Sequence, residues 1–188
     1  MATIAPASDS RTWVSRAEAD ALLDDDTRRE LIAGELFESV PSGRRHSKVG
    51  LRFGGGVERF ATDHDLGEVF GADIGVVFRE SPMLLLGQDA AFVRKERLPE
   101  GDDTWFLRVV PDMVIEVVSP SDTRREVAAK VALYLELGVS LVWVADPALR
   151  TVTIYRRGRD PLIVEGDDAV DGEDVLPGFR MPLPDLFR

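Results

Sequence analysis

The sequence contains no cysteine and only two histidines. Without thiols the chain can form neither a disulfide bond nor a zinc–thiolate site, and it cannot use a cysteine nucleophile. It has no apolar run close to the roughly 20 residues of a membrane-spanning helix. Its first residues also lack the basic start and apolar stretch of a secretory signal. We therefore expect a cytoplasmic protein with no membrane segment.

Basic charge is also scarce, because 23 Lys and Arg face 34 Asp and Glu, which gives a net charge of −11. Broad, non-specific binding to nucleic acid needs a basic surface, so the composition argues against it. It does not argue against a local basic groove or a metal-bridged phosphate. The densest basic cluster, for which a solvated helix start is the ordinary interpretation, comprises Arg44, Arg45, His46, Lys48 and Arg52.

The length of 188 residues, with 44% hydrophobic and 30% charged side chains, suits one globular domain with a real core. We expect a flexible tail over 1–14 and a single domain over 15–188. The patterns predict helices at 15–23, 47–63 and 123–138, and strands at 30–38, 68–78, 89–93, 107–118, 140–146 and 151–156. Loops are expected at 39–46 and 94–104, and a loop with a short apolar piece at 79–87. This order predicts an α/β fold with a mixed central β-sheet flanked by helices.

The stretch 111–139 contains two charged residues that do not suit a core. Glu116 lies within the apolar run from Met113 to Val118. Because both alternating faces of this strand are mostly apolar, it reads as a central strand covered on both sides. A carboxylate there is costly unless it is paired, hydrogen-bonded or metal-bound. A structural salt bridge or a strand that ends early would also explain Glu116.

The following helix carries the second such residue, Lys130. Thr123 and Glu126 have the spacing of a capping box, and Gly138 fits a C-cap. Lys130 lies within the widened apolar arc of the helix, four residues before Tyr134. We expect it to point at the sheet or along its edge, although a lysine that extends its ammonium to solvent is the ordinary alternative.

Several strings of the sequence are similar to those of a known family. They are ELIAGEL, His46, DAAFV, PDMVIEVVSPSD, Lys130 followed by YLELGVSLVWVADP, VTIYR and LPGFRMPL. Together they resemble the Uma-two family of restriction-endonuclease-like proteins, in the PD-(D/E)XK nuclease superfamily. The resemblance extends over about residues 25–188 and is most specific around EVVSPSD and Lys130.

This resemblance implies a restriction-endonuclease-like core in which Asp89 and Glu116 bind Mg²⁺ or Mn²⁺. The superfamily lysine two residues after the glutamate is replaced by Val118, so the resemblance implies that Lys130 serves instead. Glu35 matches an assisting acidic residue. The family usually has proline before the aspartate, where this chain has Gln88.

The chemistry of these residues agrees with that assignment. Carboxylates on neighbouring strands suit Mg²⁺, which prefers oxygen ligands, and Lys130 could orient or deprotonate the attacking water. His46 is a candidate substrate-binding residue that contacts phosphate. Taken singly, Asp89 could only begin a strand, Glu35 could lie at the surface beside a turn, and His46 could be an exposed loop residue.

The resulting hypothesis is a magnesium-dependent endonuclease that hydrolyses phosphodiester bonds of DNA, as a homodimer formed through apolar C-terminal strands. The alternative is a catalytically inactive nuclease fold kept for binding or assembly, which the acidic composition favours. Asp112 shares a strand face with Glu116 but stands at the strand's start, so we expect it to be structural.

Overall fold

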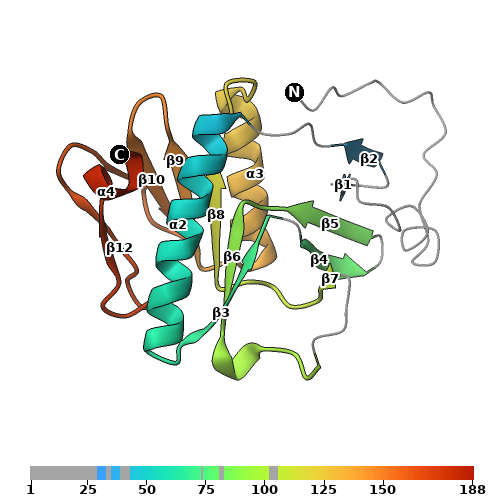
Figure 1. Cartoon of the computed structure of the whole chain (residues 1–188). Coiled ribbons are helices and arrows are strands. Elements are labelled where there is room, and N and C mark those ends of the chain that lie inside the picture. The colour runs from blue at the N-terminus through green and yellow to red at the C-terminus, as the bar shows by residue number, and fades with distance from the viewer. Residues whose placement is uncertain (1–28, 33–34, 39–42, 73, 81–82, 102–105) are drawn as a thin grey trace. The chain divides into compact units, whose positions relative to one another are not determined.

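The computed structural model describes residues 29–32, 35–38, 43–72, 74–80, 83–101 and 106–188. The chain forms two compact units (Figure 1). The first unit consists of Met1–Pro41, Ala72–Gly87 and Pro99–Val109, and the second of Ser42–Gly71, Gln88–Leu98 and Val110–Arg188. The tail predicted over 1–14 and the helix predicted over 15–23 lie outside the described residues, and a single domain over 15–188 stays a prediction.

A six-stranded sheet of order β11-β10-β9-β8-β6-β3 forms the centre of the second unit. Its strands are β3 (Gly67–Gly71), β6 (Ala90–Arg94), β8 (Met113–Val117), β9 (Leu141–Asp146), β10 (Thr151–Arg156) and β11 (Leu162–Val164). The β8–β9 pair is parallel, whereas the neighbouring pairs β3–β6, β6–β8, β9–β10 and β10–β11 are antiparallel. The predicted mixed central sheet is thereby confirmed.

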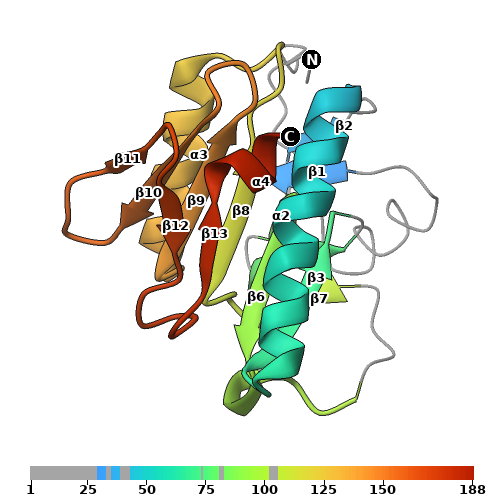
Figure 2. The same cartoon turned by 60° about the vertical axis from the view of Figure 1, so that its left-hand side comes forward.

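Two helices, α2 (Arg44–Asp63) and α3 (Arg124–Leu137), cover opposite faces of this sheet (Figures 1 and 2). Phe53 of α2 is fully buried in the main core cluster, which includes Ile115 of β8, and its ring stacks on Trp143 of β9 at 5.0 Å between centroids. Because side chains alternate along β8, Glu116 faces the other layer, where it contacts α3. The same core is completed by β12 (Ala169–Asp171), β13 (Arg180–Pro182) and α4 (Leu183–Phe187).

Helix α2 begins at Arg44 and not at Ser47, so the loop predicted over 39–46 is wrong for its last residues. The helix buries Val49, Phe53 and Val57, as its spacing predicts. Two of its glycines, Gly54 and Gly56, lie where neighbouring side chains pack closely against the helix. An added Cβ at Gly54 would lie 3.3 Å from Ala90 Cβ, and one at Gly56 would overlap Met181 Cε, whereas Gly55 faces open space.

Helix α3 has the predicted ends. The Thr123 hydroxyl accepts a hydrogen bond from the backbone N–H of Glu126, and the Glu126 carboxylate accepts one from the backbone N–H of Thr123. Gly138 closes the helix with φ of 109°, a left-handed value that glycine adopts without steric strain. The capping box and the C-cap predicted from the sequence are confirmed.

The single strand predicted over 107–118 is wrong, because this stretch forms two strands in different sheets. Phe106–Leu107 is β7 of the first unit, and Met113–Val117 is β8 of the second. Pro111 lies between them, and proline has no N–H for a strand ladder. Asp112 is buried and accepts hydrogen bonds from Arg94 N (3.0 Å) and from an Arg97 guanidinium nitrogen (2.7 Å), which confirms its structural role.

The first unit contains a five-stranded sheet of order β2-β1-β5-β4-β7. Its other strands are β1 (Arg29–Ile32), β2 (Glu35–Glu38), β4 (Gly75–Glu80) and β5 (Met83–Gly87). The predicted strand pair within 30–38 is confirmed as the antiparallel pair β1–β2. The short apolar piece expected within 79–87 forms β5. In the second unit, the loop predicted over 94–104 includes a single 3-10 turn, η1 (Lys95–Arg97).

Candidate active site

The pairing of β6 with β8 holds Asp89 beside the last residues of β8. Ala90 lies opposite Ile115 in this antiparallel register, and Asp89 directly precedes the paired residues. The N–H of Asp89 donates to the backbone oxygen of Ile115, the residue before Glu116, at 3.1 Å. Asp89 Oδ2 also accepts a 2.8 Å hydrogen bond from Val117 N. The sheet therefore holds the Asp89 carboxylate beside the end of β8.

Helix α2 supplies a third side chain to this place. His46 Nε2 lies 3.2 Å from Asp89 Oδ2, and the two side chains are only 11% and 8% exposed. The interpretation of His46 as an exposed loop residue is thus wrong, since it belongs to the first turn of α2 and is largely buried. Its predicted contact with substrate stays a prediction.

Helix α3 contributes two side chains that meet Glu116 from the other layer. Lys130 Nζ lies 3.1 Å from Glu116 Oε1, and the Tyr134 hydroxyl donates a 2.6 Å hydrogen bond to the same oxygen. Lys130 Nζ also lies 5.9 Å from the centroid of the Tyr134 ring. The expectation that Lys130 points from the helix toward the sheet is confirmed.

Exposure differs across this group in a way that matters for chemistry. The Lys130 side chain is 30% exposed and that of Glu116 is 16% exposed, whereas Tyr134 is fully buried. Solvent therefore reaches the charged pair, while the phenol behind it is fixed in the packing between α3 and the sheet. The arrangement combines two carboxylates, one ammonium and one imidazole.

Tyr134 was missed as a site residue by sequence reasoning, which assigned it to the apolar arc of α3. The available signal was its position four residues after Lys130 on the same helix face. A tyrosine in such an arc can bury its ring and still use its hydroxyl, which must find a partner when buried. Here that partner is the acid on β8.

Glu35 is the first residue of β2 and pairs with Ile32 in the first unit. The site described above is built from the second unit alone. The role implied for Glu35 therefore stays a prediction.

The donor set suits a hard cation. Within the described residues, no three His, Cys, Asp or Glu side chains are grouped so as to hold a metal ion. Magnesium does not need such a cage, because it commonly binds through one or two carboxylates and takes its remaining ligands from water and substrate phosphates. Asp89, directly before β6, and Glu116, on the adjoining strand β8, fit that pattern better than they fit a zinc site with three or four protein ligands.

Comparison with solved structures shows the fold. A crystal structure described as "a putative nuclease belonging to DUF820 from Anabaena variabilis" superposes with a TM-score of 0.75 at 20% sequence identity. The similarity covers 85% of this chain and 89% of that one. No described helix is long and apolar enough to cross a membrane.

Comparison with curated proteins found no match. A family model described as "Uma2: Putative restriction endonuclease" matches residues 16–184. The match includes His46, Asp89, Glu116, Lys130 and Tyr134, and it runs through nearly the whole sequence. The chain is therefore a member of the Uma2 family.

Proposed function

We propose that this protein is a metal-dependent endonuclease that hydrolyses phosphodiester bonds of DNA. The observation that carries the proposal is the attachment of Asp89 to β8 at Ile115, the residue before Glu116, whose Oε1 lies 3.1 Å from the Lys130 ammonium. The family description as a restriction endonuclease supports the same reaction class. A single site would explain why Glu116 lies in an apolar strand, why Lys130 lies on the sheet-facing side of α3, and why Asp89 precedes a buried strand.

Asp89 and Glu116 would hold Mg²⁺ or Mn²⁺. When bound, such a cation stabilises the charge that develops on the phosphate and makes water a better nucleophile. Val117 N and His46 both contact Asp89 Oδ2, and they would keep this carboxylate in place at the strand end. The Tyr134 hydroxyl would likewise keep the Glu116 carboxylate in place.

Hydrolysis requires a water oxygen to attack phosphorus while the bond from phosphorus to the leaving oxygen breaks. The attacking water must lose a proton, and the leaving oxygen must gain one. Lys130 is suited to orient or deprotonate the water, or to neutralise charge on the phosphate, because its side chain is partly exposed beside Glu116. His46 would contact phosphate, and Glu35 would assist, in keeping with the family resemblance.

A second candidate function is a nuclease fold kept for binding or assembly without catalysis. One observation favours it: Glu116 Oε1 is contacted by both Lys130 and Tyr134. Such a carboxylate is stabilised by protein groups alone, as a structural ion pair would be. The net charge of −11 points the same way.

The test is cleavage of supercoiled plasmid in MgCl₂ or MnCl₂, together with calorimetric titration of MnCl₂. Glu116→Gln keeps the side-chain shape but removes the charge, so it should abolish metal-dependent nicking and weaken Mn²⁺ binding while circular dichroism is unchanged. Glu165→Gln, at an exposed position between β11 and β12, is the matched control and should behave as the wild type. Cleavage that survives Glu116→Gln would overturn the assignment, and a wild type that neither binds Mn²⁺ nor nicks DNA would establish the non-catalytic alternative.

A further inference from the structure

We propose that a basic surface on α2 and the turn before β10 binds the sugar–phosphate backbone of the DNA and leads it to Asp89. This surface comprises Arg44, Arg45, Lys48, Arg52 and Arg150. The identity of the ligand as DNA rests on the proposed function. The existence of a polyanion-binding surface rests on the observations below.

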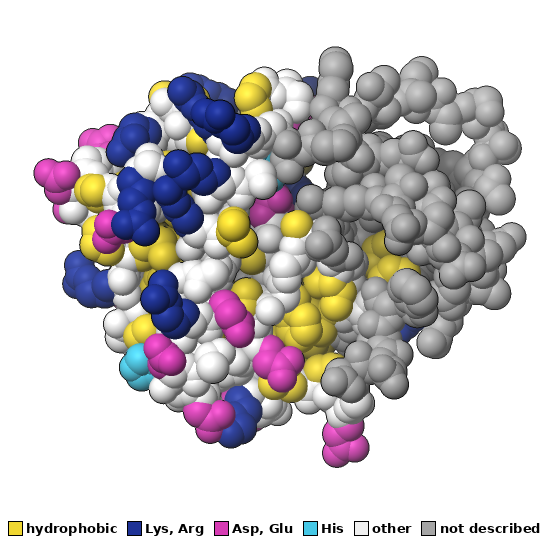
Figure 3. Space-filling model, in the orientation of Figure 1, with side chains coloured by type: hydrophobic (Ala, Val, Ile, Leu, Met, Phe, Trp, Pro, Cys, Tyr) yellow, Lys and Arg dark blue, Asp and Glu magenta, His cyan; other side chains and the backbone are white. Residues whose placement is uncertain are grey.

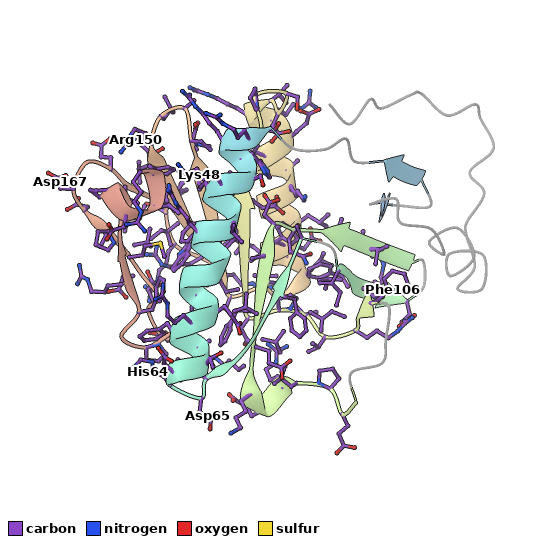
Figure 4. The ribbon with its side chains drawn as sticks, viewed as in Figure 1. Lys48, His64, Asp65, Phe106, Arg150 and Asp167 are labelled. Carbon is purple, nitrogen blue, oxygen red and sulfur yellow. The ribbon has the colours of Figure 1, made fainter. Side chains whose placement is uncertain are left out.

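The first observation is that two separate elements form one continuous surface. Arg52 on α2 donates hydrogen bonds to the carbonyl oxygens of Leu186, at 3.3 Å, and of Arg188. Arg150 donates to the carbonyl oxygen of Phe187 at 3.0 Å. The two guanidinium groups therefore hold the same three-residue segment. Figure 4 shows Lys48 and Arg150 at the same end of the unit.

The second observation is the local charge. The segment 43–57 contains no Asp or Glu, and neither does 147–157. Arg44, Arg45 and Lys48 are exposed, and within the described part of the chain none of them forms an ion pair. Figure 3 shows Lys and Arg side chains gathered over the upper left of the described part, with acidic side chains at its left margin and lower down. In a chain of net charge −11, this separation leaves a positive potential at one place.

Acidic residues also lie near this surface. Asp146 Oδ1 accepts hydrogen bonds from Ala148 N (2.8 Å) and Leu149 N (3.0 Å) in the turn that carries Arg150. Asp185 on α4 lies 3.9 Å from a guanidinium nitrogen of Arg188, and both side chains are mostly exposed. Arg188 is thus already paired, and it is not counted in the basic surface. Arg52 and Arg150 are engaged with backbone oxygens of 186–188, so Arg44, Arg45 and Lys48 are the residues whose charge is most available to a polyanion.

The third observation is the spacing. Arg45, Lys48 and Arg52 follow one another at intervals of three and four residues, so they share one face of α2. Seven residues of helix span about 10 Å, which corresponds to roughly three nucleotides of one strand at 3.4 Å each. A strand that lies along this face can place successive phosphates against successive cations.

The fourth observation connects this surface to the chemistry. His46, whose imidazole contacts Asp89, lies in the same first turns of α2 as Arg45 and Lys48. It faces inward and is 11% exposed, whereas its two neighbours face solvent. A backbone bound along the helix therefore runs toward the Asp89 end of the sheet. This continuity favours DNA over an anionic membrane, which would need no path to the carboxylates.

Contacts to phosphate position a protein on DNA but carry no sequence information. The basic surface should accordingly set the affinity and its salt dependence, and should leave any sequence preference unchanged. Its loss should weaken binding to unrelated duplexes by similar factors.

The experiment measures binding of a fluorescein-labelled duplex by anisotropy over a range of salt concentrations, in CaCl₂ to separate binding from cleavage. The test variant is Arg45→Ala with Lys48→Ala. Alanine keeps the helix, so circular dichroism should not change. The matched control is Arg159→Ala with Arg180→Ala, which removes the same charge from exposed positions outside the basic surface.

We expect the test variant to bind at least tenfold more weakly and its slope of log K against log salt to fall by about 1.8, since each phosphate contact contributes about 0.9. The control should stay within twofold of the wild type. Equal losses in the two variants, or none in either, would overturn the proposal. So would binding to vesicles of anionic lipid that depends on Lys48 while duplex DNA is not bound. Equal binding of duplex RNA would overturn the restriction to DNA.

Failure of the proposed function gives a different result. A wild type that binds DNA through Arg45 and Lys48 but never cleaves it would contradict the nuclease assignment and support the basic surface. Cleavage abolished by Glu116→Gln, together with undiminished binding by the Arg45 and Lys48 variant, would support the nuclease and overturn the basic surface.

Discussion

The hydroxyl of Tyr134 donates a 2.6 Å hydrogen bond to Glu116 Oε1, the same oxygen that Lys130 Nζ approaches to 3.1 Å. Tyr134 is fully buried on α3, so the packing of α3 on the sheet fixes its hydroxyl. The helix thereby holds the carboxylate from behind while the partly exposed lysine approaches it from the solvent side. Tyr134 is a positioning residue for Glu116.

Replacement of Tyr134 by phenylalanine should lower activity without unfolding the protein. The ring is kept, and one hydrogen bond to a charged group, worth about 1.5–3 kcal/mol, is lost. We expect kcat to fall roughly 10- to 100-fold with KM for DNA almost unchanged. Steady-state nicking kinetics measure both constants. The control is Tyr155→Phe on β10. A rise in KM alongside the fall in kcat, together with a loss of helical circular dichroism, would show a merely structural role instead.

Replacement of Lys130 by methionine separates catalysis from metal binding. The change removes a positive charge 3.1 Å from Glu116 Oε1, so Mn²⁺ affinity should stay the same or rise. Cleavage should nevertheless fall at least 100-fold, because the group that orients water or neutralises charge is gone. Calorimetry and single-turnover cleavage measure the two effects. Loss of Mn²⁺ binding in this variant would mean that Lys130 only maintains the structure of Glu116.

The sequence indicates that Asp89 and Glu116 belong to neighbouring segments because each lies in or beside a short, strongly apolar strand, and β6 and β8 do adjoin. That the two carboxylates share a metal ion stays a prediction. The position of His46 in the first turn of α2 could not be predicted from the sequence. The N-cap residue of α2 is Gly43, and glycine has no side chain that could cap the helix. The sequence therefore lacks the usual N-cap signal there. The helix was consequently predicted to start after His46.

Two further differences arise from long-range packing. The stretch 107–118 is nearly continuous in apolar residues, yet its two halves pair with different sheets, and local periodicity does not specify the partner. The role of Tyr134 depends on an acid 18 residues earlier in the chain, which only the packing of α3 on β8 brings near. Apolar patterning therefore predicts where the helix packs, and the hydrogen bond is determined by the tertiary structure.

Two glycine-to-alanine substitutions should change stability in opposite directions. Gly138 has φ of 109° at the end of α3, so alanine there is strained and should cost about 1 kcal/mol or more of the free energy of unfolding. Gly55 lies within α2, and an added Cβ would have no atom within 4 Å, so alanine should add about 0.5–1 kcal/mol. Urea unfolding measures both. A shift of the same sign in the two variants would contradict the left-handed C-cap described for α3 or the open helical position described for Gly55.

The capping box of α3 should make stability depend on pH at the acid side. The backbone N–H of Thr123, and then its hydroxyl, lower the pKa of Glu126 below the ordinary glutamate value of 4.5. The folded state therefore favours the carboxylate, and the stabilisation is present above the pKa of the unfolded chain and lost as pH falls through the lower folded value. Thr123→Ala should cost about 1 kcal/mol at neutral pH.

Glu126→Gln isolates the charged part of this interaction. The variant should unfold at lower urea concentration than the wild type at neutral pH, and the difference should shrink as pH falls well below 4.5, where the wild-type carboxylate becomes protonated as well. Glu136→Gln, near the other end of α3, serves as the control for removal of one carboxylate charge from the same helix. A wild-type advantage over Glu126→Gln that persists unchanged at acid pH would mean that the carboxylate does not cap the helix through its charge.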